Sequence, residues 1–194
     1  MDVGIPLTQI EGLTHVFGEF DDDKLSDLHL ELDIDQMTAL GRYVKNVEGR
    51  IVLEVDGEKI LIDSLRGESN NGSVTVEGWI AVDDSKEYEV TVLVSGVKIA
   101  SEQSEDALAT LQGNLNGWIS ISGIQKKTTS RTGAGHLRFQ NGYLEVDPVS
   151  STAIHLLQLA LPTATSITGA EITLYIDEDR IVLDSIVLTS DEDE

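Results

Sequence analysis

Cysteine is absent from the 194-residue sequence, and cations, aromatic residues and prolines are scarce. Without cysteine the chain can form no disulfide, no thiolate metal site and no cysteine nucleophile. Lys and Arg number 13 against 35 Asp and Glu, so the formal net charge is −22. This charge excludes a nucleic-acid backbone as a favoured partner, because binding to phosphates depends on clustered cations. It also disfavours electrostatic docking on anionic lipid headgroups.

Long apolar runs are missing as well. None approaches the roughly 20 residues that a transmembrane helix needs, and residues 1–4 do not read as a signal peptide. We therefore expect no targeting or transmembrane segment in this chain. The 40% hydrophobic and 25% charged residues that are present suffice for a core and argue against global disorder. The length allows a single domain.

The strongest pattern in the sequence is an alternation of apolar and polar residues with a period of two. Val90, Val92 and Val94, for example, alternate with Thr91 and Leu93. The alternating runs are rich in β-branched residues and are bounded by turn signals such as Asn71-Gly72, Asp83-Asp84 and Asn141-Gly142; they cover residues 51–56, 74–82, 88–94, 115–121, 135–139 and 172–177. This pattern predicts an antiparallel β protein with one apolar and one solvated face.

Signals for helices are few. Residues 35–44 place Met37, Leu40 and Val44 at helical spacing, and residues 104–111 read as a short acidic helix. Residues 150–161 are rich in leucine and stop at Pro162. We therefore expect two or three short helices beside the sheet.

Residues 51–69 and 172–190 form an internal repeat that aligns without gaps. Both copies read as strand, turn and strand, and both break the two-residue rhythm at an Asp-Ser pair. An extra residue at that point predicts a β-bulge that returns Leu65 and Ile186 to the inner face of the sheet. The last strand then has an unpaired edge beside an acidic tail, residues 191–194, that would oppose aggregation. Such an edge also allows edge-to-edge self-association.

Motifs that carry chemistry are not evident. The four histidines are scattered, no G-x-S-x-G is present, and the acidic clusters at 21–23 and 83–84 lack the spacing of a calcium loop. We expect no catalytic residue, no metal and no cofactor, and therefore no enzyme.

Two groups of motifs resemble a known family. Residues 133–144, GAGHLRFQNGYL, precede Asp147-Pro148 and the leucine-rich segment, and residues 168–186, TGAEITLYIDEDRIVLDSI, follow it. This order resembles the C-terminal region of AsmA-like proteins, in the AsmA/TamB group of bacterial envelope proteins. VEGRIVL at 47–53 and LQGNLNG at 111–117 resemble the Leu-x-Gly-x-Leu strands of the same group.

The resemblance implies a β-groove, which is a long, curved and strongly twisted antiparallel sheet with an apolar inside that holds or conducts lipid chains. The resemblance covers most of residues 30–190. We expect one domain over residues 1–194, with 1–30 as leader strands and 191–194 as a disordered acidic tail. The expected function is non-enzymatic lipid binding and transfer in the cell envelope or periplasm, as one part of a longer bridge in outer-membrane biogenesis. Its expected partners are phospholipid acyl chains and membrane-anchored parts of the same system.

The expected groove lining consists of the inward aliphatic and aromatic residues of the alternating runs: Ile51, Leu53, Val55, Val74, Val76, Ile80, Val90, Val92, Val94, Leu115, Ile119, Ile121, Leu137, Phe139, Ile172, Leu174 and Ile176. Alternation alone favours a closed β-sandwich, in which a second sheet would cover the same residues, and the resemblance together with the paired bulges reverses this preference. That alternative predicts a structural or adhesive protein with an acidic surface that binds calcium, or binds carbohydrate through Trp79 and Trp118.

Overall fold

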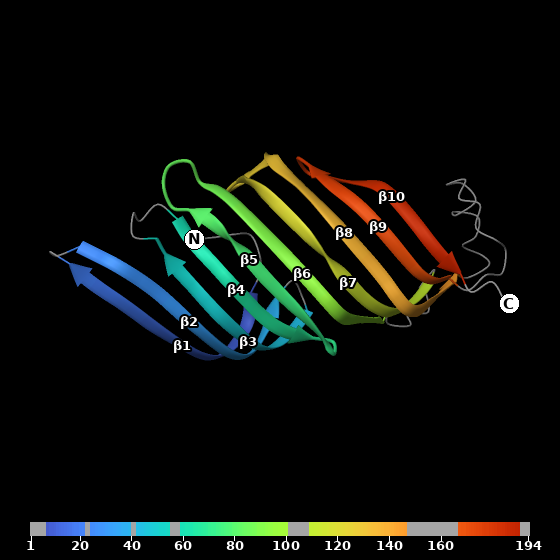
Figure 1. Cartoon of the computed structure of the whole chain (residues 1–194), viewed down its shortest axis with the longest axis horizontal. Coiled ribbons are helices and arrows are strands. Elements are labelled where there is room, and N and C mark those ends of the chain that lie inside the picture. Colours follow the sequence, from blue (N-terminus) through green and yellow to red (C-terminus); the bar gives the residue numbers. More distant parts are fainter. Residues whose placement is uncertain are drawn as a thin grey trace.

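The computed structural model describes residues 7–21, 24–39, 42–54, 59–100, 109–146 and 167–190. In these ranges ten strands form one antiparallel sheet, and each strand pairs with its neighbours in the chain (Figure 1). The strands are β1 (Leu7–Asp21), β2 (Lys24–Ala39), β3 (Arg42–Leu53), β4 (Lys59–Ser69), β5 (Gly72–Ala81), β6 (Glu87–Ala100), β7 (Ala109–Ile124), β8 (Lys127–Val146), β9 (Ile167–Asp177) and β10 (Arg180–Ser190). The prediction of a mainly antiparallel β protein is confirmed.

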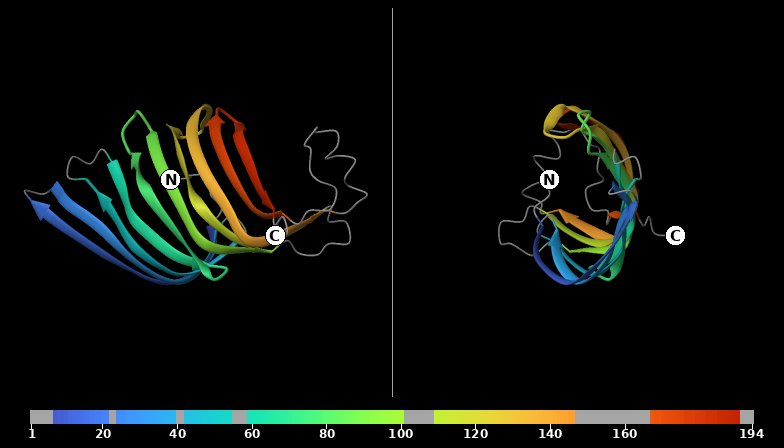
Figure 2. Two further views of the ribbon diagram at one scale, coloured as in Figure 1. Left: turned by 45° about the vertical axis from the view of Figure 1, so that its right-hand side comes forward. Right: turned by 90° about the vertical axis from the view of Figure 1, so that its left-hand side faces the viewer.

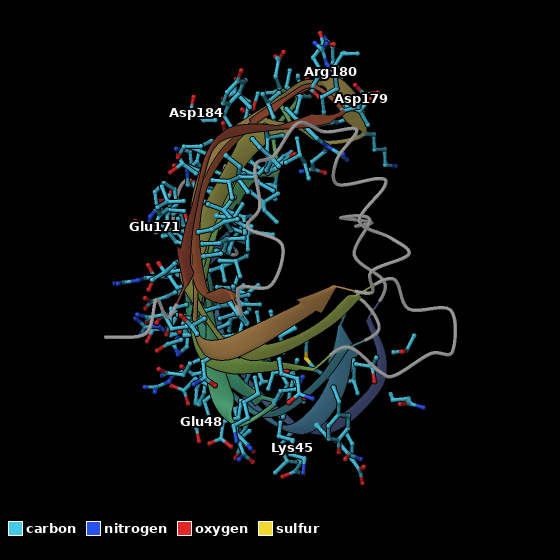
Figure 3. The ribbon with its side chains drawn as sticks, turned by 90° about the vertical axis from the view of Figure 1, so that its right-hand side faces the viewer. Lys45, Glu48, Glu171, Asp179, Arg180 and Asp184 are labelled. Atoms are coloured by element: carbon cyan, nitrogen blue, oxygen red, sulfur yellow. The ribbon has the colours of Figure 1, made fainter. Side chains whose placement is uncertain are left out.

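The sheet is open and curled. β1 and β10 are its two edges and do not pair with each other. Seen along the succession of strands, the ribbon forms an arc with a concave and a convex side (Figures 2 and 3). The curled sheet is longest in the direction that crosses its strands. Residues that pair across neighbouring strands therefore follow one another along this direction.

Bulges inside the strands account for the curvature. Five residues inside strands adopt a left-handed backbone conformation at points where the pairing shifts: Gln9, Asn46, Ser64, Gly96 and Asn141. A bulge adds a residue to one strand, which bends that strand and increases its twist. Bulges recur from β1 to β8, so the bending is distributed over the sheet.

Both bulges predicted from the internal repeat are confirmed. The pairing shifts between Ile62 and Leu65 in β4, and again between Leu183 and Ser185 in β10. The two repeats are the β3–β4 and β9–β10 hairpins. The turn expected at Asn141-Gly142 is wrong, because Asn141 is a bulge residue inside β8.

The β4–β5 turn also differs slightly from the sequence signal. Its central residues are Asn70 and Asn71, with φ of 46° and 64°, and Gly72 already belongs to β5. Two residues with positive φ match the right-handed twist of a hairpin, and Asn tolerates this conformation better than most residues. The Asn-Gly signal therefore located the turn to within one residue.

The helix expected at residues 35–44 is wrong. Residues 35–39 belong to β2 and residues 42–44 to β3, where Met37 pairs with Val44 across the two strands, while residues 40–41 lie outside the described ranges. Residues 109–111 of the second expected helix lie in β7, and residues 104–108 lie outside the described ranges. The expected helix at 150–161 and the tail at 191–194 also lie outside them.

The described strands have little conventional core. The chain exposes 13412 Å², whereas a compact globule of this mass would expose about 9,000 Å². None of the described side chains is fully buried. Six described apolar residues are buried to a lesser degree: Ile34, Val47, Ile80, Ala81, Phe139 and Leu174. The closed β-sandwich is therefore wrong for the described residues, which form a single layer.

Candidate functional site

The continuous aliphatic rows of the described sheet lie on its concave face. Figure 3 places Glu48 of β3 and Glu171 of β9 on the outside of the arc. Side chains alternate along a strand, so Ile51 and Ile172 lie inside. Residues paired directly across two strands share a face, which extends this assignment from strand to strand.

One apolar row crosses the whole sheet. Each member pairs with the next, from the first strand to the last, and every member is aliphatic or glycine. The row is Val16, Leu30, Ile51, Ile62, Gly78, Val90, Ile121, Gly133, Ile176 and Ile181. We call it the central row.

Parallel rows flank the central row on the same face. One is Leu28, Leu53, Ile60, Ile80 and Tyr88. Two others are Leu65, Val76, Val92, Ile119, Gly135, Leu174 and Leu183, and Gly67, Val74, Val94, Gly117, Leu137, Ile172 and Ile186. None of these rows contains Asp, Glu, His, Lys or Arg, so the concave face offers aliphatic contact along its length.

The structure brings the expected lining residues together. All of them except Val55, which lies outside the described residues, fall in these rows or in the short row of Val97, Leu115 and Phe139. The expected lining omitted residues of β1, β2, β4 and β10, such as Leu30, Ile62 and Leu183, although the predicted bulges placed Leu65 and Ile186 on the inner face. The signal for β2 was present in the alternation of LHLELDID at residues 28–35.

Burial on this face is incomplete. Ile80, Phe139 and Leu174 are 7 to 8% exposed, whereas most members of the rows are only half-buried. With strands about 4.8 Å apart, the central row is about 43 Å long, and with alternate residues about 6.8 Å apart the four rows cover about 20 Å along the strands. Soluble monomers rarely expose contiguous apolar patches beyond a few hundred Å². The concave face therefore has the extent of a binding surface.

The convex face carries charged and polar residues, some of which pair across neighbouring strands. Arg50 and Asp63 form an ion pair at 3.0 Å between β3 and β4. The hydroxyl of Thr91 donates to that of Ser120 at 3.0 Å. These contacts involve exposed or half-exposed side chains, which solvent also stabilises.

Trp79 and Trp118 lie on the convex face, as their polar row partners Glu89 and His136 indicate. The Nζ atom of Lys59 lies 4.4 Å from the Trp79 ring centroid, so a cation already contacts that ring. Strand and residue spacing separate the two tryptophans by about 16 Å. They therefore do not flank one sugar-sized site.

One carboxyl in a turn is stabilised by a hydrogen bond. The Ser85 hydroxyl donates to Asp83 at 2.6 Å, and this hydrogen bond lowers the pKa of the exposed Asp83 carboxyl in the β5–β6 turn. Within the described ranges, no three carboxylates or histidines are placed to share a metal ion. The same ranges hold no helix with the length and apolarity of a membrane span.

Comparison of the chain with protein-family models, with curated proteins and with solved structures finds no match. Function therefore has to be inferred from the concave face and its chemistry. In the described residues the extended aliphatic surface is a candidate ligand site, because its apolar side chains remain partly accessible.

Proposed function

We propose that the chain is a non-enzymatic lipid-binding module whose concave face forms a groove for acyl chains. The observation that carries this proposal is the central row, which crosses ten strands without a charged or polar side chain. The face contains no acid, base or nucleophilic histidine in its rows, which favours binding over catalysis.

The physical chemistry of this face supports an apolar occupant. Each methylene moved from water to an apolar surface contributes about 0.8 kcal/mol. Ten methylenes along the rows would contribute about 8 kcal/mol before the cost of ordering the ligand. An acyl chain on this face would cover the exposed part of half-buried aliphatic residues such as Val90 and Ile121.

The dimensions are also suitable. A bilayer core of about 30 Å contains two acyl layers, so one acyl chain extends about 15 Å. The central row spans about 43 Å across the strands, which allows acyl chains to lie end to end along the groove. Because the rows carry no cation, binding should depend on the acyl chain and show little headgroup specificity.

The resemblance of residues 133–144 and 168–186 to AsmA-like proteins adds a cellular setting to the proposal. We place the module in a bacterial cell envelope, where it would handle phospholipids together with membrane-anchored parts of the same system. The high negative charge is compatible with this role, because the convex face remains solvated while the concave face holds lipid.

Lipid recovery from the purified chain tests the proposal. Native mass spectrometry and solvent extraction after expression in bacteria should recover phospholipid from the wild type. Val92→Asp places a charge within the rows and should remove most of the bound lipid, because an unpaired carboxylate is costly in an apolar site. Leu93→Asp, one residue away on the convex face, is the matched control and should retain it.

The fold of both variants is checked by circular dichroism and thermal unfolding. Wild-type protein that emerges without lipid, or equal lipid recovery from both variants, would contradict the proposal. Should Val92→Asp unfold, the milder Val92→Thr should still lower lipid recovery relative to Leu93→Thr.

A further inference from the structure

Both edges of the sheet expose apolar side chains on both faces. On β10, Ile181 is 68% exposed on the concave side and Val187 is 57% exposed on the convex side. On β1, Val16 is 64% exposed on the concave side and Leu13 is 63% exposed on the convex side. In the same row as the exposed Leu183 (54%), its neighbour Leu174 is 7% exposed. Apolar side chains on the two edge strands are thus more exposed than interior ones such as Leu174, because each edge strand has a neighbouring strand on one side only.

The edge strand β10 has little protection against further pairing. Natural edge strands are usually blocked by lysine, proline or inward-pointing charges. The eleven residues of β10 contain Arg180 and Asp184 as their charged residues, and Arg180 already pairs with Asp177 at 3.1 Å. From Ser185 to Ser190 the strand carries no charge.

The two edges match each other. The ten strands alternate in direction, so β10 runs opposite to β1. A second copy placed with its β1 beside β10 would therefore continue the antiparallel alternation with the same face inward. The central row begins at Val16 and ends at Ile181, so the two residues would face each other across this junction.

The flanking rows keep the same register. Thr14 and Leu183 end the row next to the central row, and Gly12 and Ile186 end the one beyond it. The bulge at Asp184 supplies the extra residue that brings Ile186 opposite Gly12. We propose that β10 of one copy pairs with β1 of a second copy, so that chains associate head to tail and their apolar rows become continuous.

This inference depends on the edges alone and holds whether or not the concave face binds lipid. The interface joins two different edges, so each added copy presents a new free edge and the association can continue beyond a dimer. Each copy carries a net charge of −22, so repulsion opposes association. Because salt shortens the screening length from about 10 Å at 0.1 M to about 3 Å at 1 M, association should increase with salt.

Analytical ultracentrifugation over a concentration series, at low and high salt, tests the inference on the purified chain. The wild type should form dimers and longer species that grow with concentration and salt. Val16→Lys and Ile186→Lys each place an inward charge at one edge, and each variant alone should remain monomeric. Leu93→Lys, on an interior strand, makes the same charge change and should associate as the wild type does.

Mixing the two edge variants separates head-to-tail pairing from other arrangements. Each variant retains the edge that the other has lost, so the mixture should form one-to-one dimers and no longer species. A wild type that stays monomeric at high salt would overturn the inference. Dimers of Val16→Lys or of Ile186→Lys alone would also overturn it, because they would indicate pairing of like edges or of faces. Val187→Lys, opposite Glu171, is a second β10 variant should Ile186→Lys fail to fold.

Discussion

The concave and convex faces of the sheet are made from alternate residues of the same strands, yet they differ in what they require. On the convex face, pairs such as Arg50–Asp63 and Thr91–Ser120 satisfy each other or are solvated. On the concave face, adjacent aliphatic rows leave partly exposed apolar surface that water covers at a cost. An apolar partner on the concave face would remove this surface from water, whereas the polar pairs of the convex face need no such partner.

One convex row makes the contrast sharper. Over β1–β5 it is apolar or aromatic, with Phe17, His29, Val52, Leu61 and Trp79. Over β6–β10 the same row is polar, with Glu89, Ser122, Thr132, Asp177 and Arg180. Its neighbour along the strands carries Glu31, Arg50 and Asp63. A single apolar row beside charges is ordinary protein surface, whereas several adjacent apolar rows make a larger patch than soluble monomers usually expose.

The largest stability difference between the faces should come from aromatic residues. The Phe139 ring lies on glycine backbone, because a Cβ atom on Gly113 would come within 2.3 Å of it. Phe139→Ala should lower the free energy of unfolding by about 3 kcal/mol. Tyr175→Ala, on the convex face and 44% exposed, should cost less than about 1 kcal/mol. Urea denaturation measures both, and equal losses would mean that the two faces contribute alike.

The smallest effect should come from the convex ion pair. Arg50 and Asp63 are 50% and 56% exposed in their side chains. A double-mutant cycle with Arg50→Ala and Asp63→Ala should give a coupling of about 0.5 kcal/mol, which decreases as salt is added. A coupling of about 2 kcal/mol that resists salt would contradict the comparison, because the convex pairs would then hold the sheet together.

Much of the architecture could be predicted from local pattern. The two-residue period gives the strands, and the Asp-Ser breaks in the repeat predict the bulges at Ser64 and Asp184. The concave residues of β3 and β5–β9 followed from the same alternation. These features are local, because strand geometry decides which side chains share a face.

The remaining features depend on information that the alternation does not contain. Met37 and Val44 are seven residues apart, which suits two turns of a helix and also a cross-strand pair at the end of a hairpin. Asn141 suits a turn and also a bulge, because both need a left-handed residue. An open sheet and a sandwich share one alternation, so whether a second layer covers the apolar face could not be read from it.

Photo-crosslinking locates a bound lipid on one face of the sheet and so tests whether acyl chains bind to the concave rows. The purified chain is incubated with phosphatidylcholine vesicles that contain a phospholipid with a photoactivatable group in its acyl chain, and the adducts are mapped by mass spectrometry. If acyl chains bind in the concave groove, adducts should concentrate on its rows, among Val90, Val92, Ile119 and Ile121. Adducts confined to convex residues such as Leu93 and Trp118, or no adducts at all, would contradict it.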